Sequence, residues 1–170
     1  MTRKSLTLLL GLLLAATTAH AKDIEIGTVE IAGRTSAAFA IDLDEDNTLS
    51  LGTDGYYYLM PDVGVGAFLD FTKTFGDADA YSFGIGPQAI YNYSLDEVTS
   101  LYGRAGLGYL QADSDAGDSA SGWTFVMAGG AKYFVTENVS VNGELNYTHD
   151  GGDFDSNLIT ALFGISVYLR

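Results

Sequence analysis

Residues 158–169 read Leu-Ile-Thr-Ala-Leu-Phe-Gly-Ile-Ser-Val-Tyr-Leu and are followed by Arg170. In a β-strand, successive side chains point to opposite faces. One face of this stretch is then apolar throughout and the other is mostly small or polar: Ile159, Ala161, Phe163, Ile165, Val167 and Leu169 against Thr160, Gly164, Ser166 and Tyr168. The apolar face suits lipid, where a strand must pair on both edges because unpaired backbone groups are costly. The stretch therefore predicts the closing strand of a barrel.

The chain begins with the features of a secretory signal peptide. Arg3 and Lys4 precede an apolar run over residues 6–16, and a small-x-small cleavage site ends at Ala21. The run is too short for a membrane-spanning helix, which needs roughly 20 apolar residues. We expect residues 1–21 to be removed after Ala21, which leaves a β-barrel domain over residues 22–170.

Composition narrows the class of protein. Hydrophobic residues make up 47% of the chain and charged residues 18%, with 21 Gly and 11 Tyr, as expected when apolar residues alternate along membrane strands. The absence of Cys excludes disulfides. The net charge is −14, and it becomes −16 once Arg3 and Lys4 leave with the signal peptide. Nucleic acid is therefore excluded as a partner, because phosphate binding needs clustered Lys and Arg.

Alternating patterns predict seven more strands, the first over about residues 30–43 and the third over about 63–72. Turns or loops are expected at 44–47, 60–62, 73–80, 94–99, 113–122, 136–138 and 150–157. The connections after odd-numbered strands include the long, acidic, Gly-rich ones, whereas the others are short, which is typical of outer-membrane barrels with extracellular loops and periplasmic turns. The fold class is thus predicted as all-β, an eight-stranded antiparallel up-and-down transmembrane β-barrel. Pro87, inside the fourth strand, is tolerable only at a bulge or at an irregular pairing.

The charged residues of the strands share a face with the Gly, Ser, Asn and Gln residues. This face should line the lumen, because a charge facing mid-membrane lipid costs roughly 2–4 kcal/mol, whereas a soluble lipocalin-type barrel would have the opposite arrangement. We expect these residues to form a charge network inside the barrel: Arg34, Asp54, Asp70, Arg104, Lys132 and Glu144. The network could be structural, with opposite charges paired in a narrow lumen, or a gate whose pairs exchange partners to admit ions.

Outward aromatic residues are expected in two belts at the membrane interfaces. The belt at the loop side would contain Phe39, Phe71, Tyr81, Tyr109, Trp123 and Tyr147, and the belt at the turn side Tyr57, Tyr91, Tyr93 and Tyr133.

Four stretches resemble the small outer-membrane β-barrel family of OmpA/OmpX type. They are residues 56–66 (Tyr-Tyr-Tyr-Leu-Met-Pro-Asp-Val-Gly-Val-Gly), 84–87 (Gly-Ile-Gly-Pro), 132–139 (Lys-Tyr-Phe-Val-Thr-Glu-Asn-Val) and 163–168 (Phe-Gly-Ile-Ser-Val-Tyr). The resemblance implies insertion by the barrel assembly machinery into an outer membrane containing lipopolysaccharide. Such barrels usually finish on an aromatic residue, whereas here Leu169 holds that place and Arg170 follows it.

Two kinds of motif are candidates for metal binding or catalysis. The spacing of calcium loops occurs twice, in Asp42-x-Asp44-x-Asp46-Asn47 and in Asp113-x-Asp115-x-Gly117-Asp118. The first stretch, however, has Asn47 and Thr53 where an EF-hand loop needs Gly and Glu. Solvated loops, loosely bridged by divalent cations to lipopolysaccharide, fit better. His149, with Asp150 and Ser156 nearby, could serve lipid A acyl chemistry, although the deacylase family has Ser two residues after its His and position 151 is Gly.

We expect a monomeric, non-enzymatic envelope protein with a structural or surface-interaction role and without catalytic, cofactor or metal residues. The alternative is a narrow porin-like channel for ions or small solutes, and the remote alternative is a lipid A-modifying acyl enzyme.

Overall fold

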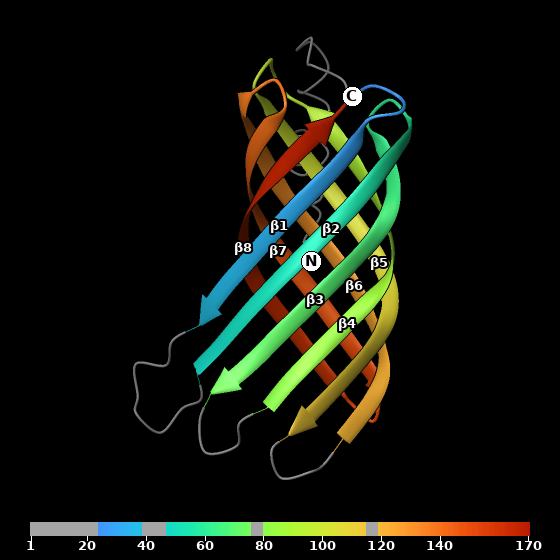
Figure 1. Cartoon of the computed structure of the whole chain (residues 1–170), viewed down its shortest axis with the longest axis vertical. Helices are drawn as coiled ribbons and strands as arrows, with labels where there is room; N and C mark the ends of the chain where they lie inside the picture. Colours follow the sequence, from blue (N-terminus) through green and yellow to red (C-terminus); the bar gives the residue numbers. More distant parts are fainter. Residues whose placement is uncertain (1–23, 39–46, 76–79, 115–118) are drawn as a thin grey trace, which may run out of the picture.

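The computed structural model describes residues 24–38, 47–75, 80–114 and 119–170, which form eight antiparallel strands closed into a barrel (Figure 1). The strands are β1 Val29–Ala38, β2 Asn47–Met60, β3 Val63–Phe75, β4 Ala80–Ser94, β5 Thr99–Ser114, β6 Ser119–Thr136, β7 Val139–Gly152 and β8 Ser156–Leu169. The predicted eight-stranded up-and-down barrel is confirmed. No helix among the described residues is long and apolar enough to cross a membrane.

The barrel closes where β8 meets β1. Thr35 lies opposite Phe163 and Val29 opposite Leu169, while the other edge of β8 pairs with β7 from Val139 to Asp150. β8 is therefore hydrogen-bonded on both edges over residues 163–167, as expected for a closing strand, whereas residues 156–162 pair with β7 alone among the described residues. Pairing on both edges satisfies the backbone polar groups that lipid cannot.

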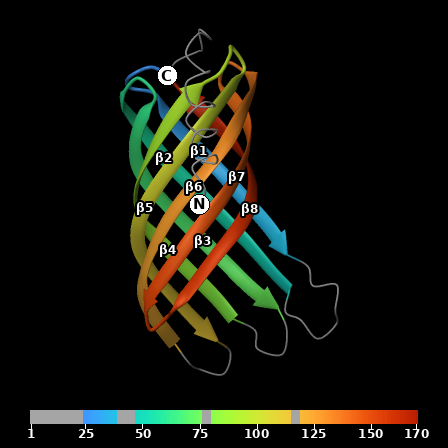
Figure 2. The same ribbon diagram turned by 180° about the vertical axis from the view of Figure 1, so that it is seen from behind.

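The strands are strongly staggered around the barrel. Starting at Arg34, one can step from each residue to its paired residue on the next strand. Stepping through β2 to β6 leads to Gly152 on β7, whereas stepping the other way, through β8, leads to Asn142 on β7. These two positions are ten residues apart (152 − 142). Such a stagger tilts the strands against the barrel axis, as Figure 2 shows from behind. It also brings β1 and β6 side chains to the same level of the lumen, although the two strands are not neighbours.

Side chains alternate between the lumen and the outer surface as the period-two pattern predicted. Outward positions are apolar and exposed, up to 68% for Phe163 and 73% for Ile159, whereas inward positions such as Arg34, Asp54 and Lys132 are buried. The predicted belt residues that are described and outward include Phe71, Tyr81, Tyr109, Trp123, Tyr57, Tyr91 and Tyr133, each at least 40% exposed. Phe39 lies outside the described residues.

Pro87 interrupts the pairing of β4 with β5 without a bulge. The ladder stops at Ile85–Tyr109 and resumes in the same register at Gln88–Gly106, because Pro has no N–H to donate. Of the two expectations for Pro87, the irregular pairing is confirmed and the bulge is not.

Several predicted loops are wrong in extent. β3 continues to Phe75, and the hairpins of β5–β6 and β7–β8 continue through pairs such as Asp113–Ser119 and Asp150–Ser156. Composition suggested loops at 113–122 and 150–157, but polar side chains do not prevent ladder hydrogen bonds where a hairpin extends beyond lipid and both faces can be solvated. The connections also differ less in length than expected, since residues 95–98 form one as long as 76–79 and 115–118. Residues 39–46, including the end of the predicted first strand, lie outside the described residues.

One end of the barrel carries the connections 61–62, 95–98 and 137–138 together with the C-terminus (Figure 1), and is called the turn end; the opposite end is called the loop end. Residues 24–28 lie against the turn end. The Ile24 amide donates to Asp62 Oδ1 over 2.8 Å, and the Asp62 amide donates to the Ile24 carbonyl over 3.1 Å. Asp62 has φ 63°, which an Asp in a tight turn tolerates. An apolar cluster is buried here: Ile24, Tyr56, Tyr58, Ile90, Tyr102, Phe134 and Tyr168.

Candidate functional site in the barrel lumen

A buried ion pair lies next to this apolar cluster. Lys132 Nζ on β6 donates to both Glu30 carboxylate oxygens on β1, over 2.7 and 2.8 Å, and both side chains are 1% exposed. The Tyr58 hydroxyl donates to Glu30 Oε2 over 2.5 Å. The rings of Tyr102 and Tyr168 lie 4.9 and 5.6 Å from Lys132 Nζ, within cation–π range. Both buried charges are therefore compensated, as their desolvation requires.

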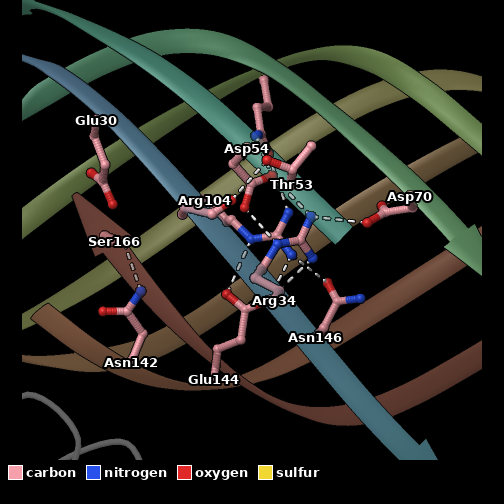
Figure 3. A network of polar contacts seen from close by, with 12 residues as sticks. Glu30, Arg34, Thr53, Asp54, Asp70, Arg104, Asn142, Glu144, Asn146 and Ser166 are labelled. Atoms are coloured by element: carbon pink, nitrogen blue, oxygen red, sulfur yellow. Dashed lines mark hydrogen bonds and ion pairs between the residues drawn. The ribbon is translucent and has the colours of Figure 1, made fainter. Parts of the chain in front are cut away.

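A second cluster lies further toward the loop end and contains two bidentate Arg–carboxylate pairs (Figure 3). Arg34 donates to Asp54 through Nε and Nη2, over 2.5 and 2.8 Å. Arg104 donates to Glu144 through Nε and Nη2, over 3.1 and 2.7 Å. Planar guanidinium groups match carboxylates in this two-bond geometry, which gives strong and directional contacts.

Gln88 connects the two Arg–carboxylate pairs. Its Nε2 donates to Asp54 Oδ1 over 2.7 Å, and its Oε1 accepts from Arg104 Nη1 over 3.1 Å. Arg34 Nη1 also lies 3.7 Å from Glu144 Oε1. Side chains of β1 and of four other strands, β2, β4, β5 and β7, thus form one continuous polar network across the lumen.

Asp70 lies at the edge of this network. Its Oδ1 accepts from Arg34 Nη2 over 3.0 Å, but its side chain is 36% exposed, compared with 2% for Asp54 and 3% for Glu144. Gly52, opposite Asp70 on β2, leaves space for this contact, because a Cβ at position 52 would overlap Asp70 Oδ1. Asp70 therefore faces both Arg34 and open space.

That space is a cavity of about 220 Å³ in the loop-end half of the lumen. Arg34 and Asp70 lie at its inner end, and Asp150, two residues before β7 ends, lies toward the loop end. Hydroxyl side chains alternate with apolar ones on its wall, including Ser50, Thr72, Thr124, Thr148, Phe68 and Leu162. A mixed lining of this kind can hold water or a small polar solute.

The structure thus places all six predicted residues on the lumen side. Arg34, Asp54, Arg104 and Glu144 meet in one cluster, Asp70 contacts that cluster from the cavity, and Lys132 lies apart with Glu30. Sequence reasoning missed Glu30. Its signal was available, since Glu30 is an even-numbered residue of the same strand as Arg34 and must face the same way.

The other candidate motifs give no site among the described residues. Most of the two calcium-like stretches falls in 39–46 and 115–118, outside those residues, and the described part of the chain holds no group of three acidic, His or Cys side chains that could bind a metal. His149 Nδ1 lies 3.0 Å from Asn157 Oδ1, whereas Ser156 Oγ donates to Asp150 Oδ2. Ser156 pairs with Asp150, the residue after His149, and paired residues point to the same face of a sheet while successive residues point to opposite faces. His149 and Ser156 therefore lie on opposite faces. The Ser–His contact needed for acyl chemistry is therefore not formed by these two residues.

Comparisons with known proteins agree with this architecture. A family model described as "Outer membrane protein beta-barrel domain" matches residues 6–167. No curated protein matches the chain. Among solved structures, the chain is similar to Neisserial surface protein A, with 20% identity, a TM-score of 0.59 and coverage of 82% of this chain and 95% of that one.

It is also similar to the N-terminal β-barrel domain of Pseudomonas aeruginosa OprF (18% identity, TM-score 0.56, 87% of this chain and 100% of that one). A third similar structure is Ail, the attachment invasion locus protein of Yersinia pestis (19% identity, TM-score 0.54, 86% and 100%). At these identities the similarity concerns the fold alone.

Proposed function

Because this chain belongs to the outer membrane protein β-barrel family, we propose that it is a structural or surface-interacting component of the outer membrane. Its barrel anchors acidic loops at the cell surface, and its own side chains block the lumen. We infer from the usual topology of such barrels that the turn end faces the periplasm and the loop end faces the outside.

The observation that carries the blocked lumen is the succession of buried layers across the barrel. An apolar cluster that includes Tyr58 and Phe134 lies at the turn end, beside the Glu30–Lys132 pair, and the Arg34–Asp54 and Arg104–Glu144 pairs follow it. An ion crossing the lumen would have to separate contacts of 2.5–3.1 Å and leave buried charges uncompensated.

Planar-bilayer recording tests this proposal. The folded protein, verified by heat-modifiable migration on gels, should show no steady conductance at any applied voltage that the bilayer withstands. A steady open pore of nanosiemens order would refute the blocked lumen and favour the porin-like alternative.

One observation favours a gated form of that alternative. Arg34 lies within 3.7 Å of three carboxylates, those of Asp54, Asp70 and Glu144, so it has partners to exchange. A gated channel predicts brief openings that become more frequent in Asp54→Asn, because Arg34 is then released from its bidentate contact. Silent bilayers for both proteins would count against the gate.

The surface role rests on charge. The whole chain has 22 acidic and 8 basic residues, and Asp153 and Asp155 are exposed in the described β7–β8 turn. Carboxylates and anionic lipopolysaccharide repel each other unless hard divalent cations bridge them. We therefore expect lipopolysaccharide binding that requires millimolar-range Mg²⁺ or Ca²⁺ and is lost in EDTA. Binding of equal strength with and without EDTA would contradict cation bridging.

The same charge argues against a polyanionic ligand held directly. One Ail structure contains the heparin analogue sucrose octasulfate, but a chain with net charge −14 offers few cationic groups for such a ligand. Comparing surface adhesion and outer-membrane permeability in cells with and without the gene would identify which surface role the protein has.

Maturation completes the proposal. Cleavage after Ala21 would leave residues 22–170, to be inserted as a monomer by the barrel assembly machinery, and it is supported by the small-x-small motif Ala19-His20-Ala21. Mass spectrometry of the outer-membrane form should give an N-terminus at Lys22. Lipid A modification is the remote alternative, and unchanged lipid A in a deletion strain would exclude it.

A further inference from the structure

We propose that the loop-end cavity binds a small organic cation with a primary ammonium group, and that Asp70 is its main anchor. This inference goes beyond the surface role proposed above and does not depend on whether the lumen conducts.

The first argument is the charge balance of the polar network. The network holds two guanidinium groups, of Arg34 and Arg104, against the three carboxylates of Asp54, Asp70 and Glu144. One negative charge is therefore in excess. It lies on the cavity side, because Asp70 is 36% exposed while the other two carboxylates are almost completely buried. An unbalanced charge in a confined, partly desolvated space favours binding of a counter-ion.

The second argument is the supply of free acceptors. The described residues give the Asp70 carboxylate one hydrogen bond, from Arg34 to Oδ1, which leaves Oδ2 available. Toward the loop end, Asp150 accepts a hydrogen bond from Ser156 at Oδ2, and its Oδ1 has no contact with solvent, so Asp150 contributes negative charge beside the cavity rather than a free acceptor. An ammonium group carries three donors and no acceptor, which suits such a site.

The third argument concerns the kind of cation. A hard divalent metal prefers six or more oxygen ligands with several carboxylates, and no suitable group of three occurs among the described residues. The cavity of about 220 Å³ has room for roughly seven waters at ~30 Å³ each. Its wall combines hydroxyls such as Thr72 and Thr148 with apolar groups such as Phe68 and Leu110. A short alkyl chain behind an ammonium head matches this lining.

The net charge of the chain supports access. A protein of charge −14 attracts cations to its surface, and exposed Asp153 and Asp155 lie in the turn next to Asp150. A free anion of the same size would meet Asp150 and Asp70 in turn and be repelled.

The test uses the whole folded barrel in lipid nanodiscs and n-propylammonium chloride as the probe, followed by amide chemical shifts. Saturable shifts are expected at Thr72, Thr124 and Thr148, and propionate or sodium chloride at equal ionic strength should not produce them. Asp70→Asn should weaken binding by about tenfold or more, since a charge-assisted contact is worth roughly one such factor. Asp150→Asn should weaken it by a smaller factor, and Asp155→Asn, an equal charge change at the same end, should leave it unchanged.

Each variant is first verified as folded by its heat-modifiable migration. If Asp70→Asn does not fold, the comparison of Asp150→Asn with Asp155→Asn decides. The proposal would be overturned if wild type and Asp70→Asn bound the probe with equal affinity. It would also be overturned if Asp150→Asn and Asp155→Asn bound it equally, or if the chemical shifts changed only at exposed loop residues.

Discussion

Replacing Lys132 by Met should destabilise the barrel strongly, because it leaves the carboxylate of Glu30 buried without its cation. In wild type the two side chains are 1% exposed and joined by contacts of 2.7 and 2.8 Å. Removing one partner of such a pair costs about 3–5 kcal/mol of unfolding free energy, whereas replacing both partners is often nearly neutral. The loss therefore measures an uncompensated charge rather than the strength of the pair.

The double variant Glu30→Gln with Lys132→Met isolates this effect. Gln keeps an acceptor for the Tyr58 hydroxyl, which lies 2.5 Å from Glu30 Oε2, but carries no charge. We expect the double variant to regain about 2 kcal/mol or more relative to Lys132→Met alone, a coupling typical of contacting residues. Lys73→Met is the matched control. Lys73 lies near the loop end, 5.2 Å from the ring of Phe75, and its loss should cost less than about 1 kcal/mol.

Urea unfolding of the barrel in lipid vesicles provides the assay. Trp123 is the single tryptophan, and it is 44% exposed on the outer surface, so its fluorescence reports its transfer from lipid to water. A loss below about 1 kcal/mol for Lys132→Met would refute the reasoning. So would a double variant as unstable as the single one.

Two further changes test local geometry. Gly52→Ala should weaken the Arg34–Asp70 contact and cost about 1–3 kcal/mol in urea unfolding, because its Cβ would overlap Asp70 Oδ1, whereas outward Gly55→Ala meets no atom within 4 Å and should be nearly neutral. In the β4–β5 turn, backbone amides of Val98 and Thr99 donate to Asp96 and hold its pKa below the usual 3.8. The stabilisation that Asp96 gives the folded state is thus present above pH 3.8 and is lost as the pH falls through the lower pKa of the folded state. The stability difference between wild type and Asp96→Ala should therefore shrink on acidification, and a difference that grows would contradict this prediction.

Much of the site could be predicted from parity alone. A strand has a side-chain period of two, so Arg34, Asp54 and Lys132 could be assigned to the lumen once the apolar face was assigned to lipid. The same rule applies to Glu30, which was missed because the strand was considered to begin there. Loop extent was the other failure, since Asp113 and Asp150 lie in ladders that composition could not predict.

Pairing inside the lumen could not be predicted in the same way. Lys132 and Glu30 are 102 residues apart and belong to strands that share no edge. They meet because the register of all eight strands is staggered by ten residues around the barrel (152 − 142 on β7). This stagger is the combined result of the registers of eight strand pairs, so no local sequence pattern predicts it.

The sequence by itself determined the strand number, the lipid-facing side and the identity of the closing strand, because these depend on alternation within single strands and on the need to satisfy backbone groups in lipid. The tertiary structure alone decided which lumen charges neutralise each other and which one remains. Asp70 looks equivalent to Asp54 in the sequence, yet closure of the barrel buries Asp54 between Arg34 and Gln88 and leaves Asp70 facing a cavity. That difference arises from stagger and tilt, which are properties of the closed sheet rather than of any strand in it.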